Sequence, residues 1–120
     1  MIDALVIEPG IGGFYKTQVN DWQDYNRIVG GYFECPPLDD NRLSLFVNEE
    51  GKLTGLEPNM LATAIYHAFS KAAAAIGDVI HGTVVVTGGV DANGNTMSLD
   101  SETSDKLVNV MQSIVAAGLL

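Results

Sequence analysis

The chain has 120 residues, a length that suits one domain with a buried core. Its 15 acidic and 6 basic residues give a formal net charge of −9, which disfavours direct binding to a nucleic-acid backbone. Cys35 is the only cysteine, so no disulfide forms within the chain, and no segment approaches the roughly 20 apolar residues of a membrane span. We therefore expect a single domain over residues 1–120 in a reducing, cytoplasmic setting, without contact with a membrane.

The N-terminal quarter predicts a hairpin followed by a short helix. Residues 2–8 are apolar in the manner of a buried strand, which ends at a group of turn-forming residues, Pro9, Gly10, Gly12 and Gly13. Residues 14–19 form the second strand of the hairpin. Asn20 is the expected N-cap of the helix, with Gln23 three residues later. The helix should end at Gly30–Gly31, because glycine adopts the left-handed conformation that terminates helices.

The middle of the chain predicts further strands. Residues 32–38 are a strand whose end must leave the sheet or form its edge, because two prolines, Pro36 and Pro37, cannot pair in a central strand. Residues 43–48 and 52–56 are expected to form a hairpin around the turn at residues 49–51.

The C-terminal half predicts two helices around a buried strand. Residues 59–76 carry apolar side chains at helical spacing, and Gly77 follows as a terminator. Residues 79–90 hold the strongest strand, where Val84–Val86 indicate burial on both faces and a place at the centre of the sheet. Residues 100–117 form a second amphipathic helix, which packs on the sheet or on a second subunit.

These elements predict an α+β fold. We expect a small mixed, mainly antiparallel sheet of about five or six strands, with two or three helices packed on one face. We also expect a homo-oligomer.

Two pairs of adjacent acids invite a catalytic or metal-binding interpretation. Glu49–Glu50 and Asp39–Asp40 could supply carboxylates for a metal or for acid–base chemistry. Adjacent residues in a hairpin point to opposite faces, however, so a solvated turn is the favoured interpretation for both pairs.

One loop partly matches a calcium-binding template. Asp91, Asn93, Asn95 and Glu102 occupy positions 1, 3, 5 and 12 of that template. Thr96 stands where the template requires glycine, and a strand rather than a helix precedes the loop. We therefore favour an Asx turn that leads into an N-capped helix, and we expect no metal or cofactor.

The remaining reactive residues and the glycine pairs favour structural roles. Cys35 is expected to be a buried thiol whose pKa is raised by its flanking residues Glu34 and Pro36. His67 and His81 lack a sequence-local partner for a catalytic triad, although His81 is the better functional candidate. Two glycine pairs, Gly30–Gly31 and Gly88–Gly89, could let the backbone approach a phosphate. Helix termination explains Gly30–Gly31 and a strand bulge explains Gly88–Gly89.

Four blocks together carry a resemblance that spans nearly the whole chain: VIEPG at 6–10, VGGYFE at 29–34, NEEGKLTGLEPN at 48–59 and IHGTVVVTG at 80–88. In their order and spacing they resemble a domain-of-unknown-function family of small proteins from phages, plasmids and bacteria that carry mobile elements. The resemblance implies a genetic setting and no reaction. Small proteins from that setting often bind host defence proteins or the nucleotide signals that these proteins use.

Our leading hypothesis is a non-catalytic binding protein of phage or mobile-element origin that sequesters a small, nucleotide-like ligand and so antagonises host defence. The candidate ligand-binding residues flank the glycine-rich turns and are Tyr32, Glu34, Asn48, Asn59 and His81. The alternative is an acidic inhibitor or DNA mimic that acts on a host protein. A small enzyme is the third possibility, and nothing in the spacing of titratable residues favours it.

Overall fold

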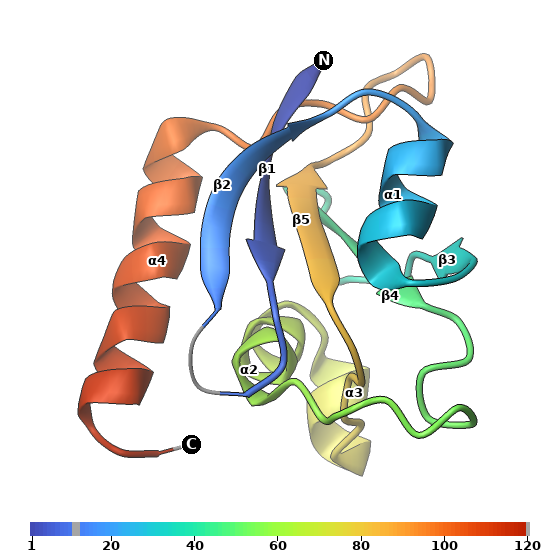
Figure 1. Cartoon of the computed structure of the whole chain (residues 1–120). Helices are drawn as coiled ribbons and strands as arrows, with labels where there is room; N and C mark the ends of the chain where they lie inside the picture. Colours follow the sequence, from blue (N-terminus) through green and yellow to red (C-terminus); the bar gives the residue numbers. More distant parts are fainter. Residues whose placement is uncertain (11–12, 120) are drawn as a thin grey trace.

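The computed structural model describes residues 1–10 and 13–119, so the predicted role of Gly12 lies outside the described residues. Five strands and four helices occur in this part of the chain (Figure 1). The strands are β1 (Ile2–Ile7), β2 (Phe14–Val19), β3 (Phe33–Glu34), β4 (Leu43–Asn48) and β5 (Val84–Gly88). The helices are α1 (Trp22–Val29), α2 (Met60–Phe69), α3 (Lys71–Ile76) and α4 (Ser101–Ala116).

The strands form one sheet in the order β2-β1-β5-β4-β3, and every neighbouring pair is antiparallel. The predicted N-terminal hairpin is confirmed, with a register that runs from Ile2 opposite Val19 to Ile7 opposite Phe14. The predicted central strand is also confirmed, because β5 lies between β1 and β4. The α+β class holds, and the sheet is antiparallel throughout.

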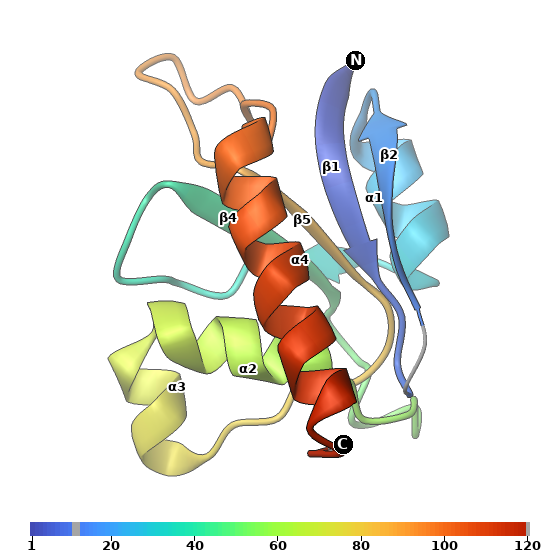
Figure 2. The same cartoon turned by 90° about the vertical axis from the view of Figure 1, so that its left-hand side faces the viewer.

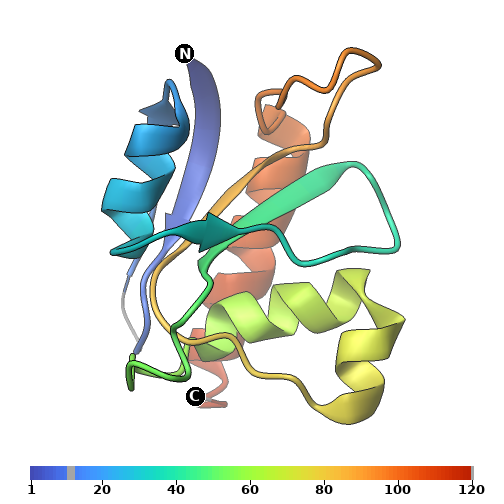
Figure 3. The ribbon, with the colours of Figure 1, turned by 90° about the vertical axis from the view of Figure 1, so that its right-hand side faces the viewer.

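Helices cover both faces of the sheet. Leu5, Ile7, Val84 and Val86 belong to a core shared with α2, α3 and α4, whereas Val6 and Val85 belong to a second core with α1. Figures 2 and 3 show α1 on one side of the strands and the other three helices on the opposite side. The expectation of helices on one face is therefore right for three of them and wrong for α1. The alternation of side chains along each buried strand makes two cores possible.

The predicted helix over residues 59–76 is two helices that meet at Ser70. Ser70 has an extended backbone, with φ −143° and ψ 104°, and its side chain accepts a hydrogen bond from the Ala73 amide at 3.2 Å. The chain turns at this point, as Figure 3 shows. A serine that caps the second helix thus ends the first one, while Gly77 terminates α3 as predicted.

The predicted strand over residues 52–56 is absent from the described residues and is replaced by a series of turns. The Leu56 amide donates to the Gly51 carbonyl at 2.9 Å, and the Thr54 hydroxyl donates to the Glu50 carbonyl at 2.9 Å. Gly55 has φ +72°, which suits a tight turn and not a strand. Local bonds to Glu50 and Gly51 therefore satisfy the backbone that a hairpin partner would otherwise satisfy.

Two other boundaries shift for local reasons. The strand predicted over residues 32–38 is reduced to the two residues of β3, since the prolines that follow cannot extend the pairing. The N-cap of α1 is Asp21 instead of Asn20, because the Asp21 carboxylate accepts from the amides of Gln23 and Asp24. The C-terminal prediction is confirmed, since Gly30 caps α1 with φ +81°.

Among the described helices, none has both the length and the apolar character needed to cross a membrane.

Candidate functional site

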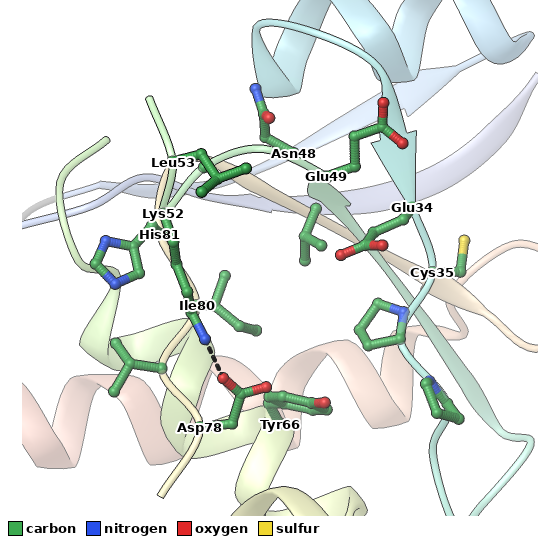
Figure 4. Close-up of a pocket in the computed structure, with 15 residues that line it drawn as sticks. Glu34, Cys35, Asn48, Glu49, Lys52, Leu53, Tyr66, Asp78, Ile80 and His81 are labelled. Carbon is green, nitrogen blue, oxygen red and sulfur yellow. Dashed lines mark hydrogen bonds and ion pairs between the residues drawn. The ribbon is translucent and has the colours of Figure 1, made fainter. Parts of the chain in front are cut away.

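A cleft of about 500 Å³ opens at one end of the sheet (Figure 4). Its sides come from β3 and the residues after it, from the end of β4 with the turns at residues 49–53, and from residues 78–81. One part of the lining is apolar: Pro36, Pro37, Val47, Leu53, Val79 and Ile80. Apart from Gly51, the rest is polar or ionisable: Glu34, Cys35, Asn48, Glu49, Lys52, Tyr66, Asp78 and His81. Its volume is typical of small-molecule sites.

Asn48 fixes the turn that forms one side of the cleft. Its Nδ2 donates to the Val29 carbonyl at 3.2 Å, and its Oδ1 accepts from the Glu50 amide at 2.8 Å. Both ends of the side-chain amide are therefore used within the protein. Asn48 ties the end of α1 to the turn after β4 and holds Glu49 at the rim of the cleft.

His81 joins the same turn to the strand that leads into β5. The His81 Nδ1 lies 2.9 Å from the Leu56 carbonyl oxygen, which places the proton on Nδ1. Gly51 packs directly against the His81 backbone, since a Cβ atom at position 51 would lie 2.7 Å from the His81 carbonyl oxygen. Glycine is thus required at position 51 for the turn to approach residue 81.

An ion pair closes one side of the cleft. The Lys52 ammonium group donates to the Asp78 carboxylate, as Figure 4 shows. This hydrogen bond is the main reason why the pKa of Asp78 lies below its usual value. The Asp78 carbonyl oxygen also lies 2.6 Å from His67 Nε2, which anchors residue 78 to α2. His67 is therefore a half-buried structural residue.

Cys35 is exposed, so the expectation of a buried thiol is wrong. The chain leaves the sheet after Glu34, which places Cys35 at the edge of the cleft instead of in the core. The predicted direction of its pKa shift is confirmed: desolvation by neighbouring atoms, and then the negative charge of Glu34, raise the pKa of Cys35 to about 11.

The structure places three of the five predicted site residues around the cleft, namely Glu34, Asn48 and His81. Tyr32 is not part of the lining, and 74% of its surface is exposed. Asn59 is fully buried: its Nδ2 donates to the carbonyls of Ile7 and Gly82, and its Oδ1 accepts from the Ala62 amide. Asn59 is therefore a buried structural residue next to the cleft, and it is not available to a ligand.

Sequence reasoning missed three polar residues of the cleft, which are Lys52, Tyr66 and Asp78. Asp78 follows the helix-terminating Gly77, a place where side chains often line sites, and this signal was available. Tyr66 lies on the buried side of α2 with core residues such as Ile65, so its pattern indicates only packing. The pairing of Lys52 with Asp78 depends on the tertiary fold.

The loop with the partial calcium-binding pattern forms the expected Asx turn. The Asp91 Oδ1 accepts from the amides of Asn93 and Asn95, at 2.8 and 2.9 Å. Asp100 caps α4 and accepts from the Thr103 amide at 2.8 Å. Within residues 1–10 and 13–119, no three His, Cys, Asp or Glu side chains are grouped to hold a metal ion.

Local structure also explains the acid pair at positions 39 and 40 and the second glycine pair. Asp39 accepts from the first amide of α3, at Lys71, and Asp40 pairs with Arg42 at 2.6 Å. Gly88 and Gly89 allow two loops to approach the sheet closely, because Cβ atoms there would overlap backbone atoms of Ser98 and Asn41. We assign these groups to the fold, so the cleft remains the candidate site.

Comparisons with known proteins give one result. No curated protein and no solved structure matches the chain significantly. The model of one family matches residues 2–112 and carries the description "Domain of unknown function (DUF3846)". The matched range includes all four sequence blocks described above. The chain therefore belongs to this family of domains of unknown function.

Proposed function

We propose that this protein is a non-catalytic binding protein and that its cleft holds a small ligand. The observation that carries the proposal is the cleft of about 500 Å³, which is lined by both apolar and polar side chains. Several of these polar groups are held in place by the fold: Asn48 by two hydrogen bonds, His81 by the Leu56 carbonyl, and Lys52 by Asp78. A site with such fixed groups loses little entropy when a ligand binds.

The reactive groups of the cleft favour binding over catalysis. Cys35 is protonated near neutral pH because its pKa is raised to about 11, and it makes no hydrogen bond to a described residue that would act as its base. A nucleophile paired with a base is the usual signature of covalent catalysis, and Cys35 and His81 do not form such a pair in the described structure.

For the biological role we keep the hypothesis that the family setting suggests, namely a protein from a phage or mobile element that sequesters a host signal. A second function, inhibition of a host protein through direct contact, is favoured by exposed apolar side chains near the cleft. Leu53 is 87% exposed and Tyr32 is 74% exposed, and the chain carries a net charge of −9. A host partner would then be a basic protein, and its capture by the immobilised protein should weaken with salt.

Native mass spectrometry of the protein purified from bacterial cells tests the ligand proposal. We expect a small molecule at fixed stoichiometry that denaturation releases, and the same spectrum reports how many chains associate. Glu34→Trp should remove the ligand by filling the cleft, into which the Glu34 side chain points (Figure 4), whereas Val110→Trp, on the exposed side of α4, should not. Protein that is empty in every preparation would contradict the proposal.

A further inference from the structure

The strand β2 forms an open edge of the sheet. It is the outermost strand in the order β2-β1-β5-β4-β3, and Figure 1 shows no further strand beside it. The opposite edge is protected, because β3 has only two residues, the Phe33 amide donates to the Asn26 side chain at 3.0 Å, and two prolines follow. By contrast, β2 has six residues and contains no proline.

The hydrogen bonds of β1 identify the backbone groups of β2 that point outward. The Asp3 carbonyl accepts from the Leu99 amide at 2.9 Å, so the backbone groups of Asp3 point away from β2. Asp3 lies opposite Gln18, and antiparallel strands alternate between bonded and non-bonded pairs. The backbone groups of Gln18, and with them those of Lys16 and Phe14, therefore point outward. Within residues 1–10 and 13–119, no backbone hydrogen bond occupies these outward groups.

A second copy of β2 matches this edge in both spacing and charge. Only alternate residues point outward, so the two self-paired antiparallel registers of greatest overlap are centred on Lys16 or on Thr17. Centring on Lys16 would set two ammonium groups directly opposite each other, which is unfavourable. Centring on Thr17 sets Lys16 opposite Gln18 of the second copy. Because Gln18 donates to the Asp3 carboxylate at 3.1 Å on the same face, each lysine then approaches a carboxylate of the other copy.

The side chains of β2 do not block this pairing. A lysine in an edge strand often prevents association, but the Lys16 ammonium is paired with Asp105 of α4 at 3.2 Å, on one face of the sheet. On the other face Tyr15 is 47% exposed, and the register centred on Thr17 sets it opposite Val19 of the second copy. An aromatic side chain opposite a β-branched one stabilises paired strands.

From these observations we propose that the protein forms a dimer in which β2 pairs with the β2 of a second copy, about a twofold axis at Thr17. The two sheets then become one continuous antiparallel sheet. The inference goes beyond the proposed binding function: the cleft lies at β3 and β4, at the other end of the sheet, so both clefts of the dimer stay open. One pair of strands is a small interface, so we expect a dissociation constant in the micromolar range.

Sedimentation velocity from micromolar to millimolar concentrations tests the association. We expect the unmodified chain to shift from monomer to dimer over this range. Lys16→Pro should stay monomeric, because proline lacks the outward amide while the neighbouring residues keep their bonds to β1. Lys16→Ala is the matched control: it keeps the amide and loses only the charge contacts, so its dimer should weaken severalfold and persist. A folded Lys16→Pro protein that dimerises like the unmodified chain would overturn the proposal.

Disulfide cross-linking tests the register and does not depend on the folding of Lys16→Pro. In a Cys35→Ser background, Thr17→Cys should form a disulfide between two chains rapidly, because the Cα atoms of such a pair lie about 4.5 Å apart. Lys16→Cys should not, because the two copies of residue 16 would lie diagonally, about 8 Å apart. Ser113→Cys, exposed on α4, reports random collision. Cross-linking of Lys16→Cys or Ser113→Cys as fast as Thr17→Cys would contradict the proposed dimer.

Failure of the dimer can be told apart from failure of the proposed function. A chain that is monomeric at millimolar concentration, and whose Thr17→Cys variant does not cross-link, overturns the dimer and leaves the edge of β2 to an extended segment of another protein. Native mass spectrometry tests the cleft separately, because a small molecule bound to monomeric protein would preserve the binding function without the dimer.

Discussion

Asn59, at the start of α2, donates a hydrogen bond from its buried side-chain amide to the carbonyl of Ile7 on β1, 52 residues earlier, at 2.9 Å. The same Nδ2 reaches the Gly82 carbonyl at 2.9 Å, on the segment that leads into β5. One amide thus fixes the N-terminus of a helix against two neighbouring strands. Because residues 80 and 81 line the cleft, this contact also determines where one side of the cleft lies.

We predict that Asn59→Ala lowers the free energy of unfolding by about 3 kcal/mol. The substitution removes a helix cap and leaves two buried carbonyls without a donor, and urea denaturation measures the loss. Asn59→Ser should recover only about 1 kcal/mol, because serine restores the cap and not the donor. Asn93→Ala, in an exposed loop, is the control and should change little. A loss below 1 kcal/mol for Asn59→Ala would contradict the structural role assigned to this residue.

A second prediction concerns the break between α2 and α3. Ser70→Ala should lower the free energy of unfolding by about 1 kcal/mol, because the Ala73 amide loses its capping oxygen in a buried position. Ser113→Ala is a matched control, since Ser113 is exposed inside α4 and bonds the Asn109 carbonyl of its own helix. That variant should be neutral or slightly stabilising, because alanine is the better helix former. Equal effects in the two variants would show that α2 and α3 do not depend on the cap.

Some elements of this fold could be predicted from the sequence, and others could not. The strands from Ile2 to Val19 and the central run Val84–Val86 were predictable, since their burial depends on local alternation and apolar character. The break at Ser70 was not, because residues 71–76 are good helix formers and the cap operates only after the chain turns. Residues 52–56 have the sequence pattern of a strand, but hydrogen bonds to Glu50 and Gly51 hold them in turns instead.

The residues of the candidate site also include some that could be predicted from the sequence and some that could not. Glu34, Asn48 and His81, which line the cleft, were selected from the sequence because they stand beside glycine-rich turns, which often form sites. Lys52 and Asp78 are 26 residues apart, and only the packing of the turn at Gly51 against residue 81 brings them together. No periodicity in the sequence indicates a contact of that kind, so this ion pair of the cleft could not be predicted from the sequence.

The ion pair between Lys52 and Asp78 predicts a pH dependence. The pKa of Asp78 is lowered in the folded protein, so the pair stabilises the fold above the pKa of an unfolded aspartate, and this contribution is lost as the pH falls through the lowered value. Lys52→Gln should therefore cost up to about 1 kcal/mol at neutral pH and almost nothing in strong acid. Urea denaturation at several pH values measures the difference.

Lys106→Gln is the control for this experiment. Lys106 pairs with Glu102 one turn earlier on α4, and both side chains are more than two-thirds exposed, at 72% and 80%. Salt should abolish the small effect of Lys106→Gln on the free energy of unfolding. The effect of Lys52→Gln should be less sensitive to salt, because the ion pair between Lys52 and Asp78 is partly buried. An NMR titration gives a direct check, because the pKa of the Asp78 carboxyl should rise in Lys52→Gln. An unchanged pKa would mean that Lys52 does not hold this carboxylate in solution.

The last prediction uses Cys35 as a reporter of the cleft. Its thiol is exposed, so a small neutral reagent such as iodoacetamide can reach it, and ionisation limits the reaction. With a pKa of about 11, the thiolate fraction at pH 7 is on the order of one in ten thousand. The alkylation rate should therefore rise about tenfold per pH unit up to pH 11, and it should lie far below the rate for the urea-unfolded chain.

Glu34→Gln should speed the alkylation of Cys35 moderately at neutral pH, because the Glu34 charge is the second cause of the raised pKa, after desolvation. Glu102→Gln should leave the rate unchanged, since Glu102 does not contribute to that shift. A rate profile with its midpoint near that of a free thiol would show that the neighbouring atoms do not desolvate Cys35 in solution.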